Sequence, residues 1–365
     1  MKQFVVFTSM IAVLILVFVS GFAQTKFIDS KVTIQNGSST LVGTLSLPSG
    51  DAPFPAVILL SGSGPQDRDE TIPQIPGYKP LRWIAESLAS QGIAVLRYDD
   101  RGVGQSTGKF DTATSADFAT DAEAAFKFLL ERPEIDAKRV GFLGHSEGGM
   151  LAAMVAARDS RVAFVISMAG PGVRGYELLR KQNERVLQAM GMTGSQFDGA
   201  MQSQKQALDL ILAKDWVGLE ALFYPEALRE LKGLSENQKK TSAELEAEAR
   251  TLAKQTVEAT QGWLEFYVSY PIAQDWAKVK VPVLALFGSL DVQVDAVQNR
   301  AGLEAALRQA GNRDVTVRVF PTANHLFQVA KTGSPTEYET LPMKFVPRFL
   351  ETIQNWMQLR FGNVK

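Results

Sequence analysis

The sequence predicts an α/β protein with a mainly parallel sheet flanked by helices. From residue 55 onward, apolar segments of strand length alternate with segments of helical length, as βαβ units require. Residues 281–287 form a continuous apolar run, which is typical of a strand covered on both faces. Residues 144–148 read G-H-S-E-G between a short apolar segment, typical of a buried strand, and a stretch that predicts a helix. This G-x-S-x-G pattern is typical of a sharp turn between a strand and a helix.

The expected elements follow in chain order. Residues 31–35 and 41–47 alternate between apolar and polar side chains, and Asn36 with Gly37 predicts the turn of a hairpin between them. Further strands are expected at 55–60, 93–98, 139–143, 163–167, 281–287 and 315–320. Helices are expected at 81–90, 115–130, 149–157, 295–310 and 343–359.

Between residues 172 and 276 the alternation stops. This stretch is helical and charged throughout and carries no strand pattern. We therefore expect one core made of residues 24–171 and 277–365, with residues 172–276 as a helical insertion. The helices expected in the insertion are 176–190, 195–214, 217–231 and 242–260.

Ser146 is the candidate nucleophile, because it stands at the centre of the G-x-S-x-G turn. The flanking glycines allow a turn that holds the serine in a strained backbone conformation. The helix expected after it directs free N–H groups toward negative charge that develops there. The chance occurrence of this motif in a chain with 29 glycines is the alternative.

A serine hydroxyl needs a base, and the chain has two histidines. His145 adjoins the serine, so its side chain should point away, which leaves His325 after the strand at 315–320. The acid should fall between Ser146 and His325 in sequence. Asp291 follows the strand at 281–287 directly and is preferred. Asp295 is the competitor, at the start of the next helix.

An acyl-transfer site also needs N–H donors for an oxyanion. The first should be the backbone N–H of Glu147, the residue after the nucleophile. The second should come from the glycine-rich loop after residues 55–60. Ser63 is the preferred donor there, and Gly62 and Gly64 are its alternatives.

These segments resemble the α/β-hydrolase superfamily over most of residues 30 to 360. The loop S-G-S-G-P-Q-D-R-D-E at 61–70, with the H-S-E-G-G turn, is similar to bacterial carboxylesterases of the EstD type. The resemblance implies hydrolysis of short-chain carboxylic esters without a cofactor, and a cap over the site formed by residues 172–276. The fold hosts many chemistries, so these motifs do not define the substrate.

Two polar stretches have structural interpretations. Residues 102–108 contain G-x-G-x-x-x-G, which fails the dinucleotide fingerprint, so we expect a tight turn with Arg101 tying nearby loops. Residues 66–70 are densely charged beside the oxyanion loop. They form either a solvated surface or an internal ion-pair network that rigidifies that loop.

The N-terminus predicts export. A basic start is followed by the apolar run 4–19 and by small residues before Gln24. We expect a signal peptide of residues 1–23, cleaved after Ala23, and a periplasmic or secreted enzyme. An uncleaved membrane anchor is the alternative. The chain has no cysteine, which excludes disulfides and lipid attachment at a cysteine.

Composition narrows the function classes. The net charge is −1 and no dense basic cluster is present, so no nucleic-acid or membrane partner is expected beyond the signal. Two separated histidines and no cysteine predict no metal site. The favoured function is hydrolysis of a small ester through an acyl-enzyme. A peptidase or amidase with the same residues, and a non-enzymatic binding module, are the alternatives.

Overall fold

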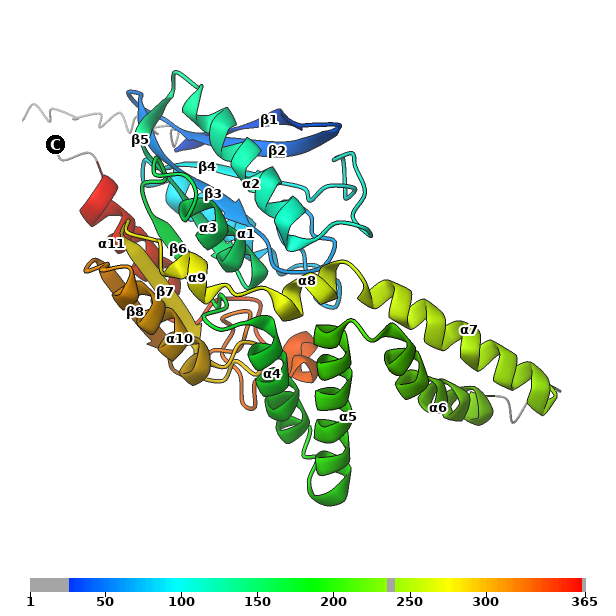
Figure 1. Ribbon diagram of the computed structural model, residues 1–365. Coiled ribbons are helices and arrows are strands. Elements are labelled where there is room, and N and C mark those ends of the chain that lie inside the picture. The colour runs from blue at the N-terminus through cyan, green and yellow to red at the C-terminus, as the bar shows by residue number, and fades with distance from the viewer. Residues whose placement is uncertain (1–25, 235–239, 363–365) are drawn as a thin grey trace, which may run out of the picture.

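The computed structural model describes residues 26–234 and 240–362 of the chain. In these residues, eight strands form one sheet in the order β1-β2-β4-β3-β5-β6-β7-β8. β2 pairs antiparallel with β1 and with β4, and all other neighbours are parallel. The strands are β1 (Phe27–Asn36), β2 (Ser39–Pro48), β3 (Phe54–Leu60), β4 (Ala94–Tyr98), β5 (Ile135–His145), β6 (Val165–Met168), β7 (Val283–Gly288) and β8 (Val315–Phe320). The mainly parallel sheet that the sequence predicts is therefore confirmed (Figure 1).

Helices cover both faces of the sheet, and each face has its own apolar core. α2, α3, α9 and α10 contribute to one core, and α1 and α11 contribute to the other. Side chains of β3 alternate between them: Ile58 lies in the first core, whereas Val57 and Leu59 lie in the second. The covering helices are α1 (Pro80–Ala89), α2 (Ser115–Leu130), α3 (Glu147–Ala156), α9 (Ala273–Trp276), α10 (Ala296–Gln309) and α11 (Phe349–Phe361).

The segment between β6 and β7 is helical, as expected. Besides α9, its helices are α4 (Gly175–Ala189), α5 (Gly194–Ala213), α6 (Trp216–Leu234), α7 (Ser242–Thr260) and α8 (Trp263–Ser269). α5 to α8 share a small apolar cluster of their own. In Figure 1, α4 and α5 project from the sheet as one pair, and α6 and α7 as a second pair. α8 and α9 connect this projecting part to the core through contacts with α2, α3 and α10.

The start of the last helix differs from the prediction. The apolar pattern predicts a helix from residue 343, but α11 begins at Phe349. Pro347 disfavours helical backbone in the residue before it, and Arg348 has a left-handed φ of 67°. The residues before α11 instead pack on the loop after β8, where the Val346 N–H donates to the Phe327 carbonyl over 2.8 Å.

The N-terminal expectation falls outside this description. The predicted signal peptide, residues 1–23, lies beyond the described part of the chain. Among the helices of residues 26–234 and 240–362, none is long and apolar enough to span a membrane.

Candidate active site

Ser146 stands on the sharp turn between β5 and α3. Its φ of 52° and ψ of −119° are a strained conformation for a residue with a side chain. The glycines of the motif make this turn possible by close packing. A Cβ on Gly144 would overlap the backbone of Gly148, and a Cβ on Gly148 would overlap the Leu60 carbonyl oxygen. The turn therefore presses the start of α3 against the end of β3.

This packing makes a stability prediction for Gly148→Ala. The added methyl meets main-chain oxygens of Leu60 and Ser61, which cannot move aside as a side chain can. We expect a loss of about 1–3 kcal/mol in the free energy of unfolding, measured by urea denaturation. The control is Gly199→Ala in α5, where a Cβ would meet nothing within 4 Å. That control should be neutral or stabilising, because alanine favours a helix over glycine. Equal effects at both sites would contradict the packing argument.

His325 and Asp291 are brought together by the loops that follow β8 and β7. Nδ1 of His325 lies 2.8 Å from Oδ2 of Asp291, and both residues are buried. The other carboxylate oxygen, Oδ1, accepts the N–H groups of Gln293 and Val294 at 2.8 Å each. A carboxylate only accepts, so Nδ1 of His325 carries the proton and Nε2 is left as the basic nitrogen.

The residue before the nucleophile candidate contacts His325 of this pair. The ring of His145, the residue before Ser146, has its centroid 4.7 Å from that of the His325 ring. In the described part of the chain, no hydrogen bond joins the Ser146 hydroxyl to His325. Such bonds are often long without substrate and shorten when it binds.

Asp295 has a different role from Asp291. Its side chain accepts the Gln298 N–H over 2.9 Å and caps the N-terminus of α10. It also lies 3.4 Å from Nε of Arg185 on α4. Of the two candidate acids, the structure therefore brings only Asp291 to a histidine.

The loop after β3 lies against the serine turn, as expected of an oxyanion loop. A Cβ on Gly62 would be 3.4 Å from the Cβ of Ser146. The Gly62 N–H donates to Oε1 of Glu70 over 2.7 Å, so it is already engaged. The N–H of Ser63 donates to no residue in the described part of the chain. Of the loop's candidate donors, Gly62 is thus the least available.

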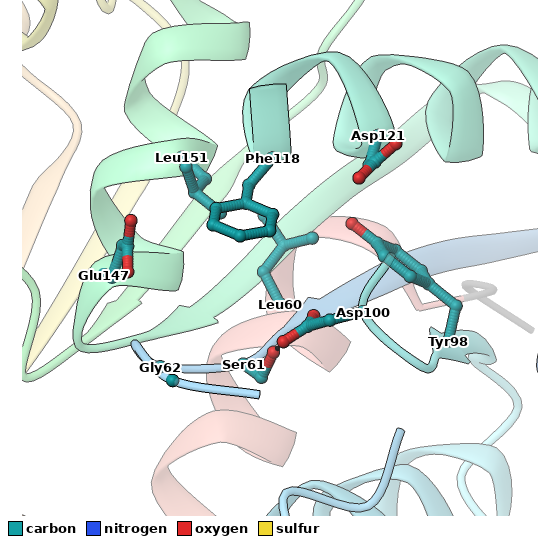
Figure 2. Close-up of a pocket in the computed structure, with 10 residues that line it drawn as sticks. Leu60, Ser61, Gly62, Tyr98, Asp100, Phe118, Asp121, Glu147 and Leu151 are labelled. Atoms are coloured by element: carbon teal, nitrogen blue, oxygen red, sulfur yellow. Dashed lines mark hydrogen bonds between the residues drawn. The ribbon is translucent and has the colours of Figure 1, made fainter. Parts of the chain in front are cut away.

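A small cavity borders this loop and the start of α3. Its volume is about 20 Å³, room for about one water molecule. Figure 2 shows Ser61 and Gly62 on the loop at one side of the cavity and Glu147 on α3 at another. Phe118 and Leu151 line its apolar wall, and the polar side chains of the lining are Ser61, Tyr98, Asp100, Asp121 and Glu147.

The Glu147 side chain ties the serine turn to the projecting helices. Its Oε1 accepts the Ser115 hydroxyl over 2.5 Å and the Trp263 indole N–H, from α8, over 2.8 Å. Burial raises the pKa of the Glu147 carboxyl, although these two hydrogen bonds lower it.

The raised pKa of Glu147 gives a prediction on stability and pH. An unfolded glutamate has a pKa of about 4.3, and the folded carboxyl titrates above its ordinary value. As pH rises past the unfolded pKa, the unfolded state loses its proton first, so this group destabilises the fold increasingly until the folded pKa is passed. Glu147→Gln should therefore stabilise the protein more at pH 7 than at pH 4, measured by chemical denaturation. An equal effect at both pH values would contradict this.

The charged run at residues 66–70 makes internal ion pairs rather than a solvated surface, and Glu70 is the member whose carboxylate contacts the oxyanion loop, through the Gly62 N–H. Arg68 makes a double hydrogen bond with Asp99, and Asp69 pairs with Arg97. Glu70 is 1% exposed and bonds to His145. The sequence motif did not identify this last contact, because it joins residues 75 positions apart.

The turn at residues 102–108 is tight, as predicted, but Arg101 ties it to a helix rather than to nearby loops. Arg101 bonds to Asp121 and to the Asp117 carbonyl on α2. Gly102, Gly104 and Gly108 have positive φ angles, which the tight turn requires. In the described part of the chain, no group of three or more metal-ligating side chains is assembled.

The sheet order and the strained serine turn after β5 define the class: the protein is an α/β hydrolase. The model of the family described as "Serine aminopeptidase, S33" matches residues 80–329. This match spans more than half of the chain, which therefore belongs to that family.

Several known proteins are similar to this chain. "Esterase EstD" of Thermotoga maritima is 28% identical over 333 residues, which cover 91% of this chain and 68% of that protein. "Polyketide transferase claH" of Penicillium crustosum is 39% identical over 98 residues, 26% of this chain and 30% of that protein. The solved Pyrococcus furiosus esterase Pf2001 has a TM-score of 0.53 at 16% identity, over 92% of both chains. The α/β hydrolase GrgF from Penicillium sp. sh18 has a TM-score of 0.52 at 17% identity, over 92% of this chain and 99% of that one. At these identities the structural likeness shows the fold alone.

Proposed function

We propose that this protein is a serine hydrolase that cleaves short-chain carboxylic esters through an acyl-enzyme intermediate. The observation that carries the proposal is the hydrogen-bonded Asp291–His325 pair, beside the strained turn that presents Ser146. The similarity to the esterase of Thermotoga maritima supports an ester as substrate.

In the proposed reaction, Ser146 attacks the ester carbonyl while Nε2 of His325 takes the hydroxyl proton. His325 then gives that proton to the leaving alkoxide. In the second half of the reaction, water attacks the acyl-enzyme while His325 takes its proton, and His325 returns that proton to Ser146 as the acid leaves. Asp291 holds the ring orientation and stabilises its positive charge. The N–H groups of Glu147 and Ser63 stabilise the oxyanion.

We further propose that residues 172–276 act as a cap that limits the size of the substrate. The hydrogen bond from Trp263 to Glu147 supports this, because it attaches α8 beside the serine turn. Export after cleavage near Ala23 is part of the proposal.

The test is hydrolysis of p-nitrophenyl esters from acetate to dodecanoate by residues 24–365. We expect kcat/KM to fall steeply with chain length, and Ser146→Ala to remove the activity. Equal rates for all chain lengths would contradict a narrow acyl pocket.

A peptidase or amidase is the second candidate, because the matched family is described as an aminopeptidase. An ester and an amide with the same acyl group, compared side by side, decide between them. If Ser146 of this protein does not react with a fluorophosphonate, the third alternative, a non-enzymatic binding module, is favoured instead.

A further inference from the structure

The Glu70 carboxylate is deeply buried and has no part in the proposed reaction. It is 1% exposed, and Glu70 has a left-handed φ of 53°, which costs energy in a residue with a side chain. Its Oε1 accepts two hydrogen bonds of 2.7 Å, from the Gly62 N–H and from Nδ1 of His145. Its Oε2 has no partner in the described part of the chain. A buried, partly satisfied carboxylate in a strained conformation is costly for folding alone.

His145 extends this contact to the second loop of the site. Its Nε2 lies 3.0 Å from the main-chain oxygen of His325. Both partners of the ring, a carboxylate and a carbonyl, accept hydrogen bonds, so both ring nitrogens must donate and the imidazole is positively charged. Burial opposes this charge, but Glu70 and the His325 carbonyl outweigh it and raise the pKa of His145. The charge of Asp291 also acts on the ring and raises the pKa of His145 further.

His145, the residue before Ser146, makes both contacts, one with Glu70 and one with the His325 carbonyl. We propose that Glu70 and His145 are positioning residues, an ion pair that holds the oxyanion loop and the His325 loop in register on either side of Ser146. This inference rests on the proposed function. Through Gly62, Glu70 fixes the peptide that precedes the Ser63 N–H. The hydrogen bond from His145 to the His325 carbonyl fixes the backbone of His325, whereas the bond from its ring to Asp291 fixes the ring.

The expected signature is a loss in kcat rather than in KM. Oxyanion donors and the base act within tenths of an ångström, and small displacements cost rate without removing contacts to bound substrate. A structural ion pair elsewhere in the same run would instead affect only the stability of the fold.

The first arm of the test uses Glu70→Gln and His145→Asn. The glutamine oxygen can still accept the Gly62 N–H but supplies no charge to the ring. The asparagine can still donate to Glu70 but cannot reach the His325 carbonyl. Each is expected to lower kcat about 10–100-fold with KM within about 3-fold. The double variant should be no slower than the slower single variant, because the two residues act as one unit.

The matched control is Asp69→Asn, which removes the adjacent ion pairs to Arg97 and Lys79 without touching the site. It should lower the free energy of unfolding and leave kcat within about 2-fold of wild type. Additive effects of the two single variants, or a kcat loss in Asp69→Asn equal to theirs, would overturn the inference.

The second arm reads the two histidines directly by 15N NMR, and the chain has only these two. The wild-type His145 ring should show two N–H groups at neutral pH, and the Glu70→Gln ring one. The His325 ring signals should shift in the same variant. Unchanged signals of both rings in folded Glu70→Gln would overturn the inference even if esters are not the substrate. If the wild-type His145 ring is doubly protonated but the protein hydrolyses no ester, the Glu70–His145 ion pair is supported and only the proposed function is rejected.

Discussion

Ser146→Ala is expected to lower kcat/KM for p-nitrophenyl acetate by about 10⁵-fold, which leaves the residual rate that the rest of the site supports. Without the hydroxyl no acyl-enzyme can form, and His325 has no proton to accept. The remaining rate would come from substrate binding and from oxyanion stabilisation of attack by water. Steady-state kinetics on purified protein measure the effect.

The fold of this variant should persist. Alanine removes one oxygen from a turn that is set by Gly144, Gly148 and the strand before it. Thermal unfolding should match wild type closely, and labelling by a fluorophosphonate should vanish. Ester turnover at the wild-type rate by folded Ser146→Ala would reject Ser146 as the nucleophile.

Asp291→Asn is expected to lower kcat about 10⁴-fold while the protein stays folded. The amide can present its NH₂ group to Nδ1 of His325, which favours the tautomer that carries its proton on Nε2. That tautomer cannot accept the serine proton. The asparagine side-chain oxygen can still accept the N–H groups of Gln293 and Val294, so the loop after β7 should keep its conformation. Kinetics with the ester preferred by wild type test this.

Asp295→Asn is the matched control, since it makes the same substitution four residues along the chain. Asp295 caps α10, and asparagine is also a good capping residue, so stability should change by about 1 kcal/mol at most. Its kcat should stay within about 3-fold of wild type. A larger kcat loss in Asp295→Asn than in Asp291→Asn would exchange the roles of the two carboxylates.

Much of the fold could be predicted because its signals are local. The alternation of apolar runs and helical segments predicts the sheet and its flanking helices, and α2 and α7 begin and end where their sequence patterns do. The sequence pattern predicts too early a start for the last helix, because the apolar residues before it belong to a segment that Pro347 keeps out of the helix.

The candidate residues could likewise be named from sequence, for two reasons. The turn around Ser146 requires glycines at fixed spacing, and the chain has too few histidines to leave a choice of base. The position of Asp291 directly after a strand favours it over Asp295. The structure adds the contact between Asp291 and His325, and shows that Asp295 caps a helix.

The sequence by itself determined the fold class, the family resemblance and the small set of candidate side chains, because strand and helix periodicity and the glycine turn are short-range patterns. Only the tertiary structure decided that Glu70 hydrogen-bonds to His145, that His145 hydrogen-bonds to the His325 carbonyl, and that Trp263 hydrogen-bonds to Glu147. These contacts join residues 75 to 180 positions apart. The packing of whole elements decides which of the buried polar groups become partners, and no local pattern carries that information.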